Sequence, residues 1–194
     1  MVQRNRCTQA TRQICQWPDN ASSGDGDSRR KGQREGDPGR SALIASPPAG
    51  LFSSDKKEQM KKKSPGQEVD QQLLFHGTSA SHLAAICEQN FDWRVCGAHG
   101  TLYGRGSYFA RDASYSHEYC PSRTGHQSMF VARVLVGDFV EGNSEYLRPP
   151  PRAGNANRLY DSCVDDPEDP SIFVIFEKHQ VYPAYILEYT FSSQ

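Results

Sequence analysis

The chain has 194 residues, a hydrophobic content of 36% and a formal net charge of -1. This length suits one domain of ordinary size, and the low apolar content indicates that part of the chain does not pack into a core. The overall charge excludes a uniformly basic nucleic-acid-binding protein. Residues 1–70 hold 13 Lys and Arg against 9 Asp and Glu, whereas residues 71–194 hold 9 against 14. A basic stretch before an acidic domain is common and does not identify a function.

The six cysteines, at positions 7, 15, 87, 96, 120 and 163, form no C-x-x-C pair and no Cys/His quartet with zinc spacing. The chain starts with polar residues, and no apolar run approaches the roughly 20 residues that span a bilayer. These features predict a reduced, soluble, intracellular protein without a metal site.

Residues 1–54 are predicted to be disordered. The stretch Ser22 to Ala49 is rich in Ser, Gly, Asp, Arg and Pro, and it cannot bury enough apolar surface to offset the entropy of ordering. Lys56 to Lys63 fits either a short helix or a solvated charge run, and we favour the solvated run. Ser64-Pro65-Gly66 would end any helix there.

The periodic apolar pattern begins with a predicted strand at Leu73 that ends in a turn at Gly77. Thr78 or Ser79 can cap a following helix. One face of that helix is expected to be buried, because its apolar residues fall at helical spacing: Leu83, Ile86, Cys87 and Phe91. The glycine-containing segment Asp92 to Arg105 is predicted to be a long loop.

The second half of the chain is dominated by predicted strands. Ser107 to Ala110 is a short strand, and Asp112 can cap a short helix over Ala113 to Tyr119. Four more segments are typical of strands: Met129 to Val136, Leu159 to Val164, Ile172 to Phe176, and Ala184 to Thr190, the last opened by Pro183. The runs that are apolar on both faces suit interior strands. Residues 137–158 are polar, contain three consecutive prolines and are predicted to be a loop. This order favours an α+β domain with mostly antiparallel sheets and short helices.

Individual residues by themselves support only ordinary structural roles. Gly104-Arg105-Gly106 precedes a strand and lacks the third glycine of a dinucleotide fingerprint, so it is more typical of a tight turn. His76 closes a strand, where a structural histidine is common. Ser116 and Tyr119 share one face of a short helix, and Tyr108 and Tyr115 lie near in sequence, a cluster that fits a core as well as a ligand pocket. Ile172 fits a buried strand.

Five blocks nevertheless occur together: Phe75-His76-Gly77-Thr78, Tyr103 to Ala110, Ser114 to Tyr119, Tyr160-Asp161-Ser162, and Ser171 to Phe176. In order and spacing they resemble the catalytic domain of the poly(ADP-ribose) polymerase family. The segments FDWRVCG and SIFVIFEKHQVYP resemble the branch whose longer members carry CCCH zinc fingers and WWE modules ahead of that domain. This branch includes interferon-induced antiviral proteins.

The resemblance implies NAD as the co-substrate, no metal, and a role for each matched residue. His76 would bind a ribose hydroxyl, and the backbone of Gly77 would pair with the nicotinamide carboxamide, which the Ser116 hydroxyl would also contact. Tyr119 would stack on the nicotinamide ring, with Tyr108 on the opposite side. Thr78 follows in the same cofactor-binding block, and residues 92–103 would cover the adenosine side.

The resemblance also implies the type of transfer, through a catalytic set of His76, Tyr108 and Ile172. Chain-forming members carry a glutamate where this sequence has Ile172, and isoleucine has no lone pair with which to hold a ribose hydroxyl. The expected activity is therefore transfer of one ADP-ribose to a protein side chain, the chain itself included, in the nucleus or the cytoplasm. Neither a membrane nor a direct nucleic-acid site is implied for this fragment.

The resemblance starts only near Lys56, so we expect a disordered, unrelated leader over residues 1–54 and a partial ADP-ribosyltransferase domain over residues 55–194. Relatives usually begin with a strand and a helix about 50 residues before the His-Gly-Thr strand. The fold is thus expected to be a two-sheet ADP-ribosyltransferase fold without its usual first strand and helix, leaving a sheet edge unpaired. Two alternatives stay open: an inactive scaffold with the same fold, and an RNA-binding protein acting through basic residues 29–63.

Overall fold

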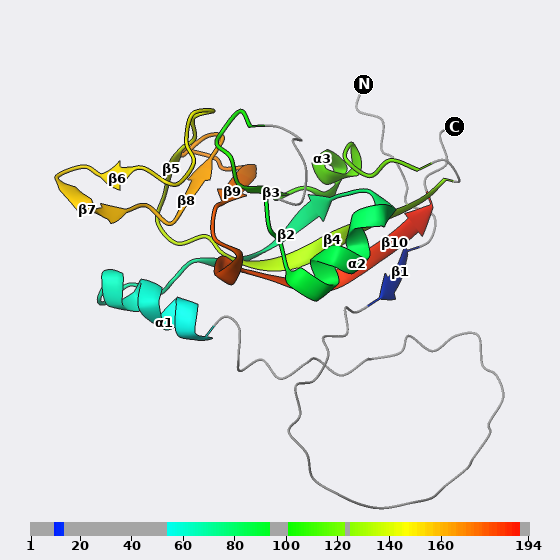
Figure 1. Ribbon diagram of the computed structural model, residues 1–194, viewed down its shortest axis with the longest axis horizontal. Helices are drawn as coiled ribbons and strands as arrows, with labels where there is room; N and C mark the ends of the chain where they lie inside the picture. Colours follow the sequence, from blue (N-terminus) through cyan, green and yellow to red (C-terminus); the bar gives the residue numbers. More distant parts are fainter. Residues whose placement is uncertain (1–9, 14–53, 94–100, 123–124, 191–194) are drawn as a thin grey trace, which may run out of the picture.

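The structure, a computed structural model, describes residues 10–13, 54–93, 101–122 and 125–190 (Figure 1). Its three α-helices are α1 (Ser54–Lys63), α2 (Ala80–Gln89) and α3 (Ala113–His117), with a 3-10 turn η1 (Lys178–Gln180). The strands are β1 (Ala10–Gln13), β2 (Gln71–Gly77), β3 (Ser107–Ala110), β4 (His126–Leu135), β5 (Phe139–Glu141), β6 (Pro151–Arg152), β7 (Asn155–Leu159), β8 (Ser162–Val164), β9 (Ile172–Ile175) and β10 (Val181–Thr190).

Eight strands form one mixed sheet in the order β1-β10-β4-β2-β3-β9-β8-β5, and β6 and β7 form a separate two-stranded sheet. All pairings are antiparallel except that of β5 with β8. The structure therefore agrees with an α+β, mostly antiparallel ADP-ribosyltransferase fold. The two sheets are unequal, however, with eight strands in one and two in the other.

Within the large sheet, β2 and β3 share the shortest pairing, since they pair only through Phe75 and Ala110. In contrast, β2 pairs with β4 over seven residues and β3 pairs with β9 over four. The sheet thus consists of two well-paired groups of strands that separate at one end of this junction. This separation positions the cavity described below.

The core lies where α2 packs across the strands β2, β4 and β10 (Figure 1). Ile86 and Phe91 are buried there, with Leu83 and Cys87 packed against them, as the helical spacing predicts. The segments expected to be interior strands are also confirmed: β4 lies between β10 and β2, and all four residues of β9 are buried. Burial on both faces of these strands explains their continuous apolar sequence.

The basic run Lys56 to Lys63 is helical, so our preference for a solvated charge run was wrong. Met60 explains the difference, because its side chain is only 2% exposed and anchors α1 against the domain. Lys56 also forms an ion pair with Glu177. Asp55 in the first turn and lysines in the last turn suit the helix dipole. As predicted, the helix ends before Ser64-Pro65-Gly66.

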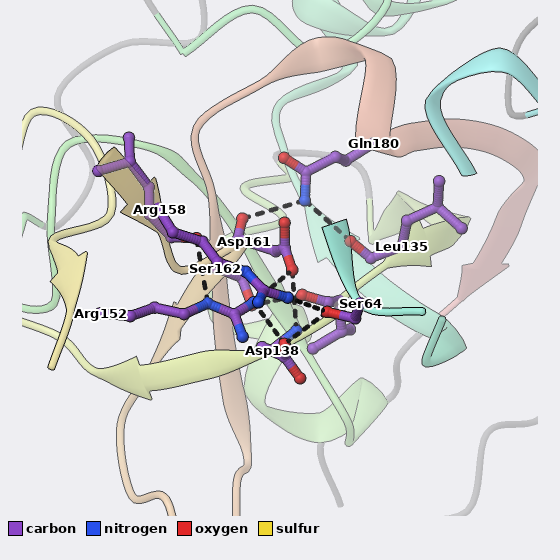
Figure 2. Close-up of polar contacts among 10 residues, drawn as sticks. Ser64, Leu135, Asp138, Arg152, Arg158, Asp161, Ser162 and Gln180 are labelled. Carbon is purple, nitrogen blue, oxygen red and sulfur yellow. Dashed lines mark hydrogen bonds and ion pairs between the residues drawn. The ribbon is translucent and has the colours of Figure 1, made fainter. Parts of the chain in front are cut away.

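A polar network ties the end of α1 and the β6–β7 hairpin to the sheet (Figure 2). Arg158 donates to the Ser64 hydroxyl over 2.7 Å, and Ser64 donates to Asp138 over 3.3 Å. Arg152 forms ion pairs with Asp138 and Asp161. These side-chain contacts therefore hold the β6–β7 hairpin against the rest of the domain.

In this region, two elements differ from those that the sequence predicts. Residues 137–158 are not one loop, since they contain β5, β6 and most of β7. The strand expected from Leu159 to Val164 is divided, with Leu159 ending β7 and β8 beginning at Ser162. The hairpin is polar and held by side chains, so it lacks the apolar alternation on which a strand prediction depends.

One strand start and two helix caps also differ from expectation. Pro183 does not open β10 but lies within it, next to a register shift between Pro183 and Tyr185. Proline cannot donate a ladder hydrogen bond, and such irregularities accommodate it. Ser79 and Asp112 occupy the cap positions of α2 and α3 without a side-chain capping bond.

Strand β1 lies within the stretch predicted to be disordered. It pairs with β10 along four residues, so the expectation that this sheet edge would be unpaired was wrong. Apart from β1 and Ser54, residues 1–54 lie outside the described part of the chain, as does half of the expected loop, residues 94–100.

Two further expectations concern cysteines and membranes. Cys120 and Cys163 are free and buried. Cys87 is disulfide-bonded, which differs from the fully reduced chain that we expected, and neither of the other described cysteines is its partner. Within the described ranges, no helix combines the length and the apolar character needed to cross a membrane.

Candidate active site

A cavity of about 790 Å³ opens where β2 and β3 separate. Its walls come from β2, the start of α2, residues 101–106, β3, α3 and the first residue of β9. At the junction between the two strand groups, backbone and side-chain atoms from both groups face this cavity. This size falls within the range of pockets that bind small molecules and cofactors.

His76, at the end of β2, is held in one orientation. Its Nδ1 lies 2.7 Å from the backbone carbonyl oxygen of Tyr108, and its ring packs edge-on against Phe91 at a centroid distance of 4.9 Å. A carbonyl only accepts, so Nδ1 carries the proton and Nε2 is left as an acceptor. Burial lowers the pKa of His76 to about 4, so the ring is neutral at physiological pH.

Gly77, the last residue of β2, lets the backbone of α3 approach closely. A Cβ built at this position would lie 1.9 Å from the carbonyl oxygen of Ser116 and 3.0 Å from Cβ of Tyr119. No other residue type leaves that space open. The close approach places Ser116, which is only 3% exposed, beside the end of β2.

Aromatic rings form the walls around this point. Tyr115 of α3 and Tyr119, in the turn after it, lie with their ring centroids 5.5 Å apart and their hydroxyls 3.2 Å apart, and each is about two-fifths exposed. Tyr108 lies on β3, and its hydroxyl donates to the carbonyl oxygen of Gly104 over 2.8 Å. These rings offer flat apolar surfaces to a planar ligand.

Ile172 begins β9 opposite Ala110 and is 7% exposed, with its side chain lining the cavity. Its backbone N–H donates to the Asp165 carboxylate over 2.9 Å. Burial raises the pKa of Asp165, but hydrogen bonds from Ser171 and Ile172 outweigh that effect, and the pKa is lowered overall. The carboxylate that steadies this strand is therefore ionised, while the cavity itself receives only an alkyl group from Ile172.

Sequence comparison with known proteins shows which family the chain belongs to. The family described as "Poly(ADP-ribose) polymerase catalytic domain" matches residues 51–191. The chain belongs to this family. It is 63% identical over 138 residues to human protein mono-ADP-ribosyltransferase PARP12, covering 71% of this chain and 20% of that protein. It is 44% identical over 158 residues to mouse protein mono-ADP-ribosyltransferase PARP11, covering 71% and 48%. The chain thus spans from about a fifth to about half of these relatives.

The structure brings all seven residues singled out from this family's sequence pattern to the same cavity: His76, Gly77, Thr78, Tyr108, Ser116, Tyr119 and Ile172. Five of them come from four separate elements, Thr78 follows β2, and Tyr119 lies in the turn after α3. Thr78 is buried, and its hydroxyl lies 3.3 Å from Nδ1 of His82. The histidine that seemed structural on its own therefore faces the same space as the two tyrosines and the serine.

Sequence reasoning assigned no role to three other residues that line the cavity, His82, Glu118 and Pro121. His82 could have been found, because it follows Thr78 by four residues at the start of a predicted helix. Trp93 and Leu102 also line the cavity and belong to the segment 92–103, which was expected to cover the adenosine side. Glu118 is the only Asp, Glu, Lys or Arg side chain among the described cavity residues.

The cavity fits an NAD molecule in its chemistry. It offers flat aromatic walls for a ring, a glycine backbone that a ligand can approach closely, and the free Nε2 acceptor of His76 for a hydroxyl. In the described ranges, no cluster of three or more His, Cys, Asp or Glu could hold a metal ion.

Proposed function

We propose that this chain is an NAD-dependent protein mono-ADP-ribosyltransferase, which transfers one ADP-ribose to a protein side chain and releases nicotinamide. The observation that carries the proposal is the meeting of His76, Tyr108 and Ile172 in one cavity with Gly77, Ser116 and Tyr119. Family membership supports the same conclusion.

In this proposal, neutral His76 uses Nε2 to accept a hydrogen bond from a ribose hydroxyl. Its Nδ1–H bond to the Tyr108 carbonyl keeps the ring from turning away. A protonated ring would have no acceptor to offer, so the lowered pKa serves this role. Holding the sugar in one orientation contributes to catalysis by lowering the entropic part of the barrier.

The nicotinamide would lie at the end of β2, against α3. The backbone of Gly77 and the hydroxyl of Ser116 would bind its carboxamide, with Tyr119 and Tyr108 on the two sides of its ring and Thr78 in the same cofactor-binding segment. NAD supplies the reaction with an activated glycosidic bond. When this bond breaks, its electron pair leaves with nicotinamide, and a lone pair of the acceptor side chain forms the new bond to the ribose carbon.

Ile172 would limit the reaction to one unit. An alkyl side chain accepts no hydrogen bond, so nothing at this point of the cavity holds the hydroxyl of a second ADP-ribose. The names of the relatives, which include the term mono-ADP-ribosyltransferase, support this reading. The acceptor would be a protein, the chain itself included.

We further propose that the catalytic unit comprises residues 55–194 and that residues 1–54 are a leader, of which β1 pairs with β10. The start of the family match at residue 51 and the start of α1 at Ser54 support this boundary. Residence in the nucleus or the cytoplasm is part of the same proposal.

The test is automodification of the purified chain with labelled NAD. We expect a discrete label of single units that is lost in His76→Ala and retained in His126→Ala, a matched control at an exposed histidine that does not line the cavity. A ladder of polymer would overturn the single-unit assignment. A folded chain without label would favour an inactive scaffold.

A further inference from the structure

Tyr108 contacts the cavity wall through two different groups. Its backbone carbonyl accepts the Nδ1–H of His76, as described above. Its hydroxyl accepts a hydrogen bond from the backbone N–H of Tyr103 over 3.0 Å and donates one to the carbonyl oxygen of Gly104 over 2.8 Å. The hydroxyl therefore connects β3 to the turn that precedes it.

This turn carries part of the cavity wall. Leu102 and Tyr103 both line the cavity, and Leu102 is 67% exposed. Neither residue lies in a helix or strand, and the turn is closed by a hydrogen bond of 3.1 Å from the Gly104 N–H to the Thr101 carbonyl. The Tyr108 hydroxyl is the side-chain group that holds it from the cavity side.

The turn is also confined from the other side. Gly104 has φ +126, and a Cβ there would lie 2.7 Å from the ring of Phe176. A Cβ at Gly142 would lie 2.7 Å from Cα of Tyr103. Phe176 and the backbone at Gly142, neither of which lines the cavity, therefore pack closely against the turn. The Tyr108 hydroxyl, on a residue that does line the cavity, satisfies two backbone groups of the turn at once.

We propose that the Tyr108 hydroxyl is a positioning group that fixes the Leu102–Tyr103 wall for NAD binding, separately from the role of the Tyr108 ring. The proposal rests on the proposed function. Tyr108 then positions two parts of the cavity wall, because its carbonyl orients His76 and its hydroxyl orients the turn. Removing the hydroxyl leaves His76 in place and releases only the turn.

Tyr108→Phe tests this, since it keeps the ring and the carbonyl. We expect the KM for NAD in nicotinamide release to rise about fivefold to tenfold, with kcat changed less than twofold, on the scale of one or two lost neutral hydrogen bonds. Tyr182→Phe, in a strand remote from the cavity lining, is the matched control and should leave both constants unchanged.

Hydrogen exchange gives a readout that does not depend on activity. In Tyr108→Phe, the backbone amide of Tyr103 should exchange faster, whereas amides of β4 keep their protection. Gly142→Ala displaces the same turn from outside, should also raise the KM for NAD, and replaces Tyr108→Phe if that variant does not fold. Unchanged exchange at Tyr103, or a fall in kcat with KM unchanged, would overturn the proposal. A wild-type chain that releases no nicotinamide would instead refute the proposed function.

Discussion

A methyl group added at Gly77 should separate α3 from β2. The built Cβ lies 1.9 Å from the carbonyl oxygen of Ser116, whereas real Cβ atoms keep at least 3.0 Å from such neighbours. The first contact is backbone and cannot rotate away, so α3 or the end of β2 must move by about 1 Å. This movement would displace Ser116 and Tyr119 together, because both lie on or directly after α3.

We therefore expect Gly77→Ala to lower kcat/KM for NAD about 100-fold, the scale of an error of about 1 Å in a positioned site, and to lower stability by about 1–3 kcal/mol through overpacking. The measurements are nicotinamide release and thermal unfolding. Gly154→Ala is the control: it has φ +80 but nothing within 4 Å of the added methyl group, so it should lose about 1 kcal/mol of stability and no activity. Normal activity in Gly77→Ala would refute the packing of α3 on β2.

Three further predictions concern the same cavity. Tyr119→Ala should weaken NAD binding about tenfold by calorimetry, since a stacking ring contributes about 0.5–1.5 kcal/mol beyond its buried area; unchanged affinity would count against this cleft. Ile172→Glu should still produce single units on a gel, because chain growth also needs loops that bind a second ADP-ribose. Polymer from this variant would show that the side chain at position 172 alone determines whether chains form. The KM for NAD should show no inflection near pH 6.5 and should rise only as the pH approaches 4, where His76 gains its proton. For the same reason, stability measured by urea unfolding should be fully present above pH 6.5 and decline as the pH falls toward 4, because the unfolded chain binds this proton more readily.

Much of the fold could be predicted because its signal is local. Apolar spacing predicted α2, and apolar runs predicted β4 and β9, since each pattern matches the period of the element that it forms. The predictions failed where tertiary contacts decide the structure. The helix α1 looks like a solvated charge run until Met60 is seen to be buried, and the β6–β7 hairpin depends on ion pairs of Arg152 with residues before β5 and β8.

The sequence by itself identified seven of the cavity residues, because their types and spacing match one family. Only the tertiary structure decided how they act together. His76 is neutral because its burial, against Phe91 and Phe109, lowers its pKa by more than the hydrogen bond to the Tyr108 carbonyl raises it. These groups are far from His76 in the chain. Gly77 matters because α3 crosses it. The second role of Tyr108, through its hydroxyl, follows from a hydrogen-bond pattern that no residue type or spacing encodes.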